Sequence, residues 1–158
     1  MKILRTLPVA IALTLTLAAR GDAPVGQYLT FSPTSLNITD AHTNLVWLRT
    51  PVATNVQTPS SPSAYAIALM LCTNAGVGWR LPSVRELLSI VDEQPHSEHV
   101  AGQDVEIFID ANAFPGTPNM RFLAASPDPS NRIWWVDFGT GVSGESKDAA
   151  TYAVRCVK

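Results

Sequence analysis

Histidine, cysteine and carboxylate side chains are the groups in this sequence whose type and spacing could do chemistry. His96 and His99 stand three residues apart, and Glu93 and Glu98 lie beside them. Imidazole and carboxylate groups are both common zinc ligands. The order is H-x-x-H, however, and Pro95 breaks the helix that would bring both rings to one side. We therefore predict a solvated loop here, with no metal site and no cofactor.

The two cysteines, Cys72 and Cys156, are the second candidate for chemistry. Outside the cytoplasm, a small and even cysteine count predicts one disulfide. The alternative is a reactive or metal-binding thiol pair. In the chain-entropy model, a bridge that closes a loop of this length stabilises the fold by about 4 to 5 kcal/mol.

The first 19 residues have the pattern of a secretory signal peptide. Lys2 and Arg5 give a basic start, and the apolar run over residues 6–19 is too short to span a bilayer comfortably. We expect an exported protein, located in the periplasm, at the cell surface or in the medium. After cleavage no stable membrane insertion is expected.

Small residues at the end of this leader offer several cleavage points. Cleavage after Ala18 or Ala19 fits best, and Ala23 fits less well. Arg20 occupies the position at which a bacterial lipoprotein would need its lipid-bearing cysteine. We therefore expect no lipid anchor.

The charge balance disfavours polyanionic partners. The whole chain has a formal net charge of −2, and removal of the leader with Arg20 leaves eight basic residues against 13 acidic ones. Affinity for nucleic acid rests on concentrated Lys and Arg, and here the basic residues are scattered. We therefore expect no nucleic-acid partner.

The length of the chain indicates one domain. We expect a short flexible lead-in over residues 20–25 and a single domain over residues 26–158.

Two segments have the pattern of helices. Ser61 and Pro62 predict the start of the first, Gly76 predicts its end, and its nearly continuous apolar sequence is typical of a core helix. The residues between Arg49 and Ser61 are expected to form a loop.

The second helix follows the run "GWRLPS". Ser83 and Glu86 form an S-x-x-E capping box. Apolar residues then recur at helical spacing, as Val84, Leu87, Leu88 and Val91. Trp79 is expected to have a structural role, packing over the junction between this run and the helix. Arg80 has potential for ligand binding, with pairing to a carboxylate as the structural alternative.

Three segments have the pattern of strands. "LVWLR" (residues 45–49) is apolar on both faces, which predicts a strand that is buried on two sides. "RIWWVDF" (residues 132–138) alternates, so that Trp135 and Asp137 face one way and Trp134 the other. In the terminal "TYAVRCVK" we expect Cys156 on the apolar face and Arg155 pointing outward. Short strands with two early helices and no βαβ unit predict an α+β domain.

The order of the motifs resembles a known family. "ITDAHTNLVWLR", "ALMLCTNAGVGWRLPSVRELLSIVD", "IDANAFPGTP", "WWVDFGTG" and "YAVRCVK" are similar to the DUF1566 or Lcl C-terminal domain of exported bacterial proteins. The resemblance implies a compact C-type-lectin-like fold, related to formylglycine-generating enzymes, with two helices flanking a small mixed or antiparallel sheet. It also implies that Cys72 and Cys156 are the family's usual cysteine pair.

The chain departs from the family pattern at two places. "FLAAS" (residues 122–126) stands where relatives commonly have a "YWSS"-type aromatic strand, and Asn44 replaces the usual glycine before Leu45. The first change removes a ring that could serve as a platform for a sugar.

The leading functional prediction is a non-catalytic, lectin-like binding module for carbohydrate or another cell-surface polymer. Its candidate contacts are Trp134 or Trp135, whichever is exposed, with Asp137 and Arg80, because sugars need a flat apolar face beside hydrogen-bonding groups. The alternatives are a structural or assembly domain of the cell envelope and, less favoured, a metal-dependent oxidase-like enzyme. The oxidase would need two free thiols to hold copper.

Overall fold

The computed structural model describes residues 23–29, 32–57, 63–125, 132–146 and 150–158. The predicted leader, the cleavage points at Ala18 and Ala19, and Arg20 lie outside these residues. The elements in chain order are β1 (Asn37–Thr39), β2 (Val46–Leu48), β3 (Ala53–Gln57), α1 (Ala64–Asn74), α2 (Val84–Leu88), β4 (His96–Val100), β5 (Gln103–Ile107), β6 (Arg121–Leu123), β7 (Ile133–Asp137), β8 (Val142–Ser146) and β9 (Thr151–Val154).

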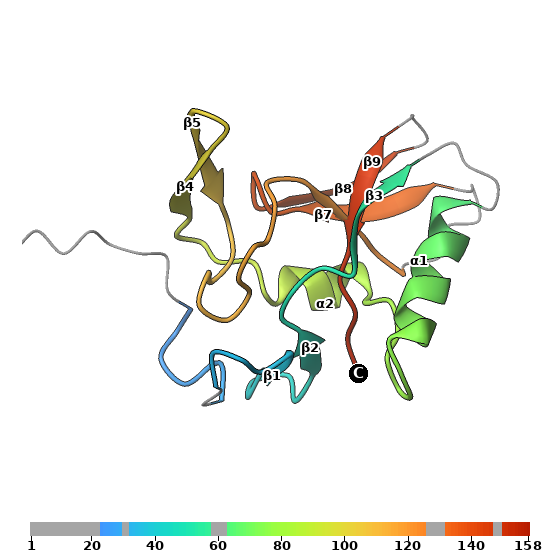
Figure 1. Ribbon diagram of the computed structural model, residues 1–158, viewed down its shortest axis with the longest axis horizontal. Helices are drawn as coiled ribbons and strands as arrows, with labels where there is room; N and C mark the ends of the chain where they lie inside the picture. The colour runs from blue at the N-terminus through green and yellow to red at the C-terminus, as the bar shows by residue number, and fades with distance from the viewer. Residues whose placement is uncertain (1–22, 30–31, 58–62, 126–131, 147–149) are drawn as a thin grey trace, which may run out of the picture.

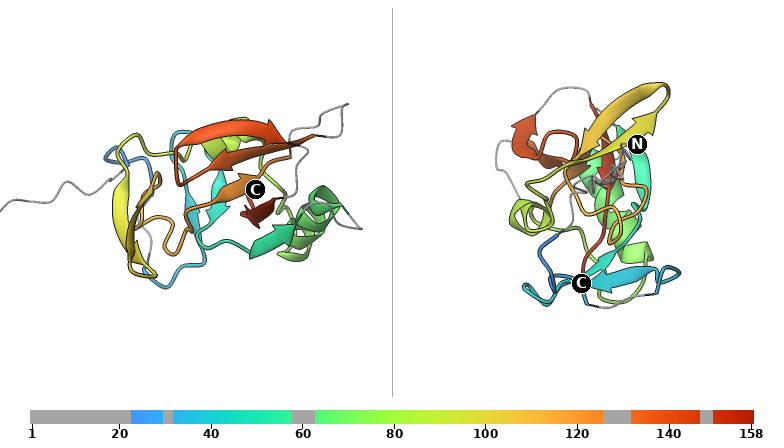
Figure 2. Two further views of the ribbon diagram at one scale, coloured as in Figure 1. Left: turned by 90° about the horizontal axis from the view of Figure 1, so that it is seen from above. Right: turned by 90° about the vertical axis from the view of Figure 1, so that its left-hand side faces the viewer.

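A five-stranded sheet with the order β3-β9-β6-β7-β8 forms the centre of the molecule. Its neighbouring strands pair antiparallel, except β6 and β9, which pair in parallel. Two separate pairs, β1-β2 and β4-β5, flank it. Figure 1 shows α1 and the β4-β5 hairpin at opposite ends of the molecule, with the sheet between them, and Figure 2 shows the same separation from above. The predicted α+β class, with two helices and a mixed, mostly antiparallel sheet, is confirmed.

Side chains that alternate along the strands divide the core into two clusters. Phe122 and Val136 belong to the cluster that includes Leu87 of α2, whereas Leu123 and Trp135 belong to the cluster that includes α1. Because successive strand residues point to opposite faces, the two helices cover opposite faces of the sheet. The predicted alternation of "RIWWVDF" is confirmed.

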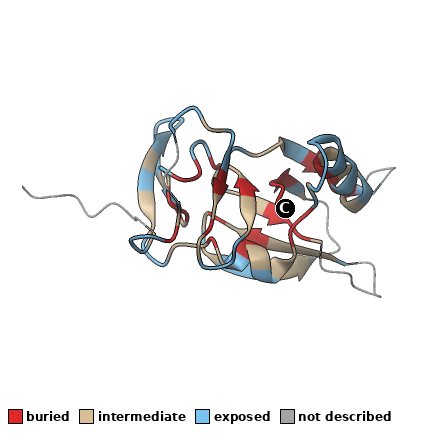
Figure 3. Cartoon of the chain, turned by 90° about the horizontal axis from the view of Figure 1, so that it is seen from below, coloured by how far each residue is buried: buried red, intermediate tan, exposed pale blue. Residues whose placement is uncertain are grey.

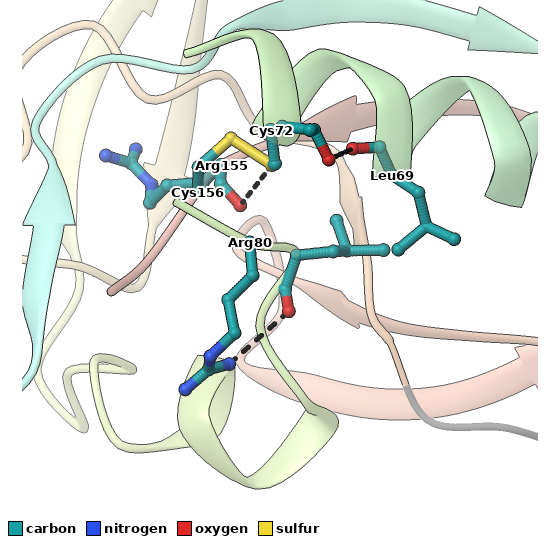
Figure 4. The surroundings of a disulfide bond; sticks show 7 residues. Leu69, Cys72, Arg80, Arg155 and Cys156 are labelled. Atoms are coloured by element: carbon teal, nitrogen blue, oxygen red, sulfur yellow. Dashed lines mark hydrogen bonds between the residues drawn. A yellow bond between two sulfur atoms is a disulfide. The ribbon is translucent and has the colours of Figure 1, made fainter. Parts of the chain in front are cut away.

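The two cysteines form the predicted disulfide. The Cys72 and Cys156 sulfurs are 2.07 Å apart and their Cα atoms 5.4 Å apart. Both residues are fully buried. The bond fastens the last turn of α1 to the residues that follow β9, as Figure 4 shows.

Arg155 does not point outward, and that prediction is wrong. Its side chain is fully buried, where it donates hydrogen bonds to the carbonyls of Leu48 and Arg49 and to the Thr117 hydroxyl. The guanidinium lies 4.7 Å from the ring centroid of Phe114. Both faces of the sheet are covered, so the side opposite Cys156 is a second core rather than solvent. Burial lowers the pKa of Arg155 to about 9, so the group remains charged at neutral pH.

The first helix is less buried than its sequence predicts. It starts at Ala64 after the N-cap Ser63, and the predicted start at Ser61 and Pro62 lies outside the described residues. Ala68 is fully buried against the sheet, but Met70 is 53% exposed. Because α1 lies at one end of the molecule, only one side of it is covered (Figure 3).

Two predicted loops contain strands. The segment after Arg49 forms β3, which pairs with β9 at the edge of the sheet. The segment after Pro95 forms the β4-β5 hairpin, closed by Ala101 and Gly102 at φ 52° and 85°. Two consecutive residues at positive φ make a tight turn that suits the twist of a hairpin.

The second helix is capped as predicted but is shorter than predicted. Ser83 and Glu86 form the capping box, and the helix ends at Leu88, which is exposed.

The substitution of Asn44 for glycine also has a local explanation. Asn44 has φ 57°, and asparagine tolerates this left-handed region better than most residues with a Cβ.

Candidate functional site

Arg80 is held in a tight polar cluster at the start of α2. Its two terminal nitrogens donate to the two carboxylate oxygens of Glu86 at 2.6 and 2.9 Å. Glu86 also accepts the backbone N–H and the hydroxyl of Ser83, at 2.8 and 3.0 Å. The hydrogen bond from Arg80 lowers the pKa of Glu86 to about 2, and the same contact raises the pKa of Arg80. Arg80 therefore has the structural partner that was the alternative to ligand binding.

The C-terminal residues close this cluster from the other side. Arg80 and Val157 exchange backbone hydrogen bonds of 2.9 and 3.0 Å, and Lys158 lies over the Trp79 ring at 4.7 Å. Figure 4 shows Arg80 pointing away from the nearby disulfide. We call this region, residues 79–86 with Val157 and Lys158, the Arg80 corner. Its position beside the disulfide makes it a junction of the fold.

The two tryptophans of β7 lie on opposite faces of the sheet. Trp134 packs against the cluster on the α2 side, and Trp135 packs against the cluster on the α1 side. The Arg121 guanidinium lies over the Trp135 ring at 4.2 Å. A Cβ on Gly144 would come within 2.6 Å of that ring, so the glycine makes room for it. Both tryptophans are half-buried, and each has a packing role.

Asp137 lies on the same face of β7 as Trp135. One carboxylate oxygen accepts the Gly139 N–H at 2.8 Å, and the other lies 3.8 Å from Arg121 Nε. Arg121 therefore links Trp135 and Asp137, while Trp134 is directed to the other face. A ligand role for Arg80, Trp134, Trp135 and Asp137 stays a prediction, since every one of them already has a structural contact.

The histidines face opposite sides of the β4-β5 hairpin, because they stand three positions apart on one strand. His96 Nε2 lies 3.1 Å from Glu98, and His99 Nδ1 lies 2.7 Å from Asp104. Within the described part of the chain, no three His, Cys, Asp or Glu residues are placed to hold one metal ion.

A cavity of about 370 Å³ lies between the N-terminal segment and the residues that follow α2. It is lined by Ala23, Pro24, Gln27, Tyr28, the segment 90–94 and Asp110. Asp110 connects the N-terminal segment to the rest of the lining, because its buried carboxylate accepts the Ala23 N–H at 3.2 Å. The same carboxylate also accepts the N–H groups of Asn112 and Ala113. We call this site the acidic cavity.

Tyr28 provides the aromatic side of the acidic cavity. Its ring packs edge-on against Phe114, with the centroids 5.3 Å apart. Its hydroxyl accepts a hydrogen bond from Gln27 Nε2 at 3.3 Å. Burial, followed by the nearby carboxylates of Asp40 and Asp110, raises the pKa of Tyr28, so the hydroxyl keeps its proton. A neutral phenol and carboxylates therefore face the same space.

Sequence reasoning missed this site for a physical reason. Tyr28, Asp92 and Asp110 belong to three different segments of the sequence, and no periodic pattern relates them. One local signal was present in "IDANAF", where Asp110 caps a turn in the way that aspartate often does. That signal predicts the turn and does not predict the cavity beside it.

Comparison with known proteins then gives the family. The family model for the Lcl C-terminal domain matches residues 37–158. The chain belongs to the Lcl C-terminal domain family. The predicted resemblance is confirmed, and membership of this family favours a bacterial surface-associated domain. Comparisons with curated proteins and with solved structures gave no match.

The Lcl C-terminal domain match covers one wall of the acidic cavity and leaves out the other. Residues 90–94 and Asp110 lie within the match, and Ala23 to Tyr28 precede it. Both cysteines and the whole Arg80 corner are inside it. Among the described helices of this Lcl C-terminal domain protein, none has the length and apolar character needed to cross a membrane.

Proposed function

We propose that this protein is a non-catalytic, exported binding module of the bacterial cell envelope, and that it takes a carbohydrate unit of a surface polymer into the acidic cavity. One observation carries the proposal. A cavity of about 370 Å³ combines the Tyr28 ring with amide and carboxylate groups. Small-ligand sites typically enclose about 300–1,000 Å³ and combine apolar walls with a few polar groups.

The chemistry of the lining suits a sugar. The protonated Tyr28 hydroxyl keeps a donor for a ligand oxygen, and the carboxylates of Asp92 and Asp110 can accept from sugar hydroxyls. Pro24 and Tyr28 add the apolar surface that the C–H face of a sugar ring needs.

The non-catalytic part of the proposal rests on the sulfur atoms. An oxidase-like reaction on this scaffold would need two free thiolates to hold copper. Here each sulfur is bonded to the other and fully buried. The disulfide also agrees with export, because such bonds persist in oxidising compartments.

Heteronuclear NMR with a panel of neutral and charged oligosaccharides tests the proposal. We expect amide shifts at Tyr28 and over residues 90–94, with little change near Trp135 and Asp137. Shifts at Arg80, Trp134, Trp135 or Asp137 would move the site to the residues that the sequence predicted. If no oligosaccharide causes an amide shift and the cell envelope nevertheless retains the protein, the proposal of ligand binding would be wrong and a structural or assembly role would be favoured.

A further inference from the structure

The acidic cavity offers a ligand many hydrogen-bond acceptors and no positively charged donor. Asp92, Glu93 and Asp110 contribute carboxylates, and none of its described lining residues is Lys, Arg or His. Arg155 influences Tyr28 electrostatically, but it is fully buried and hydrogen-bonded to backbone carbonyls and Thr117. It therefore cannot contact a ligand in the cavity.

The surroundings reinforce this negative potential. The segment from Asp92 to Asp110 contains six acidic residues and neither lysine nor arginine. Its two histidines lie against Glu98 and Asp104 on the hairpin. Fields of one sign near a cavity concentrate ligands of the opposite charge.

One buried acceptor atom at the cavity lacks a donor and a second acceptor is free to take one, which is independent of the charge count. Gln27 is 8% exposed, and its Nε2 donates to the Tyr28 hydroxyl and to the Ser89 carbonyl. The Ser89 carbonyl identifies that end of the amide as nitrogen, so Oε1 is the other end. No described residue donates a hydrogen bond to Gln27 Oε1.

At Asp92 the acceptor without a donor is also buried. One carboxylate oxygen accepts the Gln94 N–H at 2.9 Å, while Oδ2 is buried and has no partner among the described residues. A buried acceptor without a donor costs about 1–3 kcal/mol, and more when the group is charged. A positively charged ligand in the cavity would offset the uncompensated charge of this carboxylate.

We propose that the sugar bound in the acidic cavity carries a free, protonated amino group, as in a polysaccharide that contains unacetylated hexosamine. This inference rests on the proposed carbohydrate function and adds the chemical class of the ligand. An ammonium group supplies three N–H donors and one positive charge, which match the acceptors of Gln27 and Asp92 and the surrounding carboxylates. Hydrogen bonds between charged partners are about twice as strong as neutral ones.

The site is divided between the family match and the segment that precedes it. Gln27 and Tyr28 precede residues 37–158, which match the family model. Relatives that share the fold but differ in this N-terminal segment would lack one wall of the cavity.

Isothermal titration of the mature protein with glucosamine, glucose and N-acetylglucosamine tests the inference. These probes share one ring, and among them only glucosamine is cationic. We expect glucosamine to bind at least tenfold more tightly than either neutral sugar, with NMR shifts at Tyr28 and over residues 90–94. The advantage is expected to shrink at high salt, because screening weakens charge attraction.

Charge-removing variants with matched controls locate the effect. Asp92→Asn and Glu93→Gln are expected to reduce the ratio of the glucosamine affinity to the glucose affinity to threefold or less. Asp104→Asn and Glu106→Gln remove the same charge from the exposed hairpin outside the cavity, and they are expected to preserve the preference. Melting temperatures establish that each variant is folded.

The possible results separate the two proposals. Equal affinity for the three sugars at the cavity would overturn the amine inference and leave the carbohydrate site in place. A preference lost equally in the hairpin variants would also overturn it, because the attraction would then be a general effect of charge. Absence of binding by all three sugars and by longer oligosaccharides would overturn both proposals.

Discussion

The Arg80 corner and the acidic cavity both contain carboxylates, and they differ in how those carboxylates are satisfied. Glu86 in the corner accepts two hydrogen bonds from Arg80 and two from Ser83. At the cavity, Asp92 Oδ2 is buried without a partner among the described residues, and Glu93 is exposed. A saturated cluster stabilises a junction, whereas the carboxylates beside the cavity keep an uncompensated negative charge. The most conspicuous motif in the sequence thus has structural partners, and the site that we propose lies elsewhere.

The largest effect is expected from the disulfide beside the corner. Replacing both cysteines, Cys72→Ala with Cys156→Ala, should lower the free energy of unfolding by about 4–5 kcal/mol, because the bond joins residues 84 positions apart. Urea denaturation at neutral pH measures the change. A loss below about 1 kcal/mol would show that packing and hydrogen bonds hold the corner without the bond.

The next largest effect is expected at Arg155, which packs against Phe114 and directly precedes Cys156. Arg155→Met would leave the carbonyls of Leu48 and Arg49 and the Thr117 hydroxyl without their donor, at a cost of about 3 kcal/mol in unfolding free energy. Arg85→Met, on the exposed surface of α2, is the matched control and should stay within about 0.5 kcal/mol of wild type. Equal effects of the two changes would contradict the structural role of Arg155.

A smaller, pH-dependent effect distinguishes the corner from the cavity. The pKa of Glu86 falls from 4.5 to about 2 on folding, so its stabilisation is fully present above pH 4.5 and is lost as the pH falls through about 2. Glu86→Gln should therefore cost about 1–2 kcal/mol at neutral pH, after allowance for solvent screening at the exposed Arg80. The difference from wild type should disappear near pH 2.

Glu93→Gln is the matched carboxylate change at the cavity. Because Glu93 is exposed, this variant should follow the wild-type acid denaturation curve. If the loss of unfolding free energy in Glu86→Gln persists unchanged at pH 2, packing rather than charge would account for the stability of the Arg80 corner.

The smallest effect on stability is expected at Asp92. Asp92→Asn retains an oxygen for the Gln94 N–H and removes the charge from a buried atom without a partner, so the unfolding free energy should stay within about 0.5 kcal/mol of wild type or rise slightly. Thermal denaturation measures this. A loss above 1 kcal/mol would show that Asp92 is satisfied within the fold, and the contrast between corner and cavity would then fail.

Much of the scaffold could be predicted from local sequence. The capping box at Ser83 and Glu86 depends on residues three apart, and the disulfide was predicted from two cysteines in a chain that we expect to be exported. The hairpin over residues 96–107 was missed, because its histidines and acids obscure the alternation that buries Ile107. Its tight turn at Ala101 and Gly102 was the overlooked signal.

By itself the sequence determined the family, the class of fold, the pairing of Cys72 with Cys156 and the opposite faces of Trp134 and Trp135. The family follows from the resemblance of its motifs, and the other properties follow from composition and from short-range periodicity, which local backbone geometry imposes. Tertiary structure alone decided that Arg155 is internal and that Tyr28, Asp92 and Asp110 share one cavity. Long-range packing decides which face of a strand meets solvent and which distant segments adjoin, and no local pattern encodes either outcome.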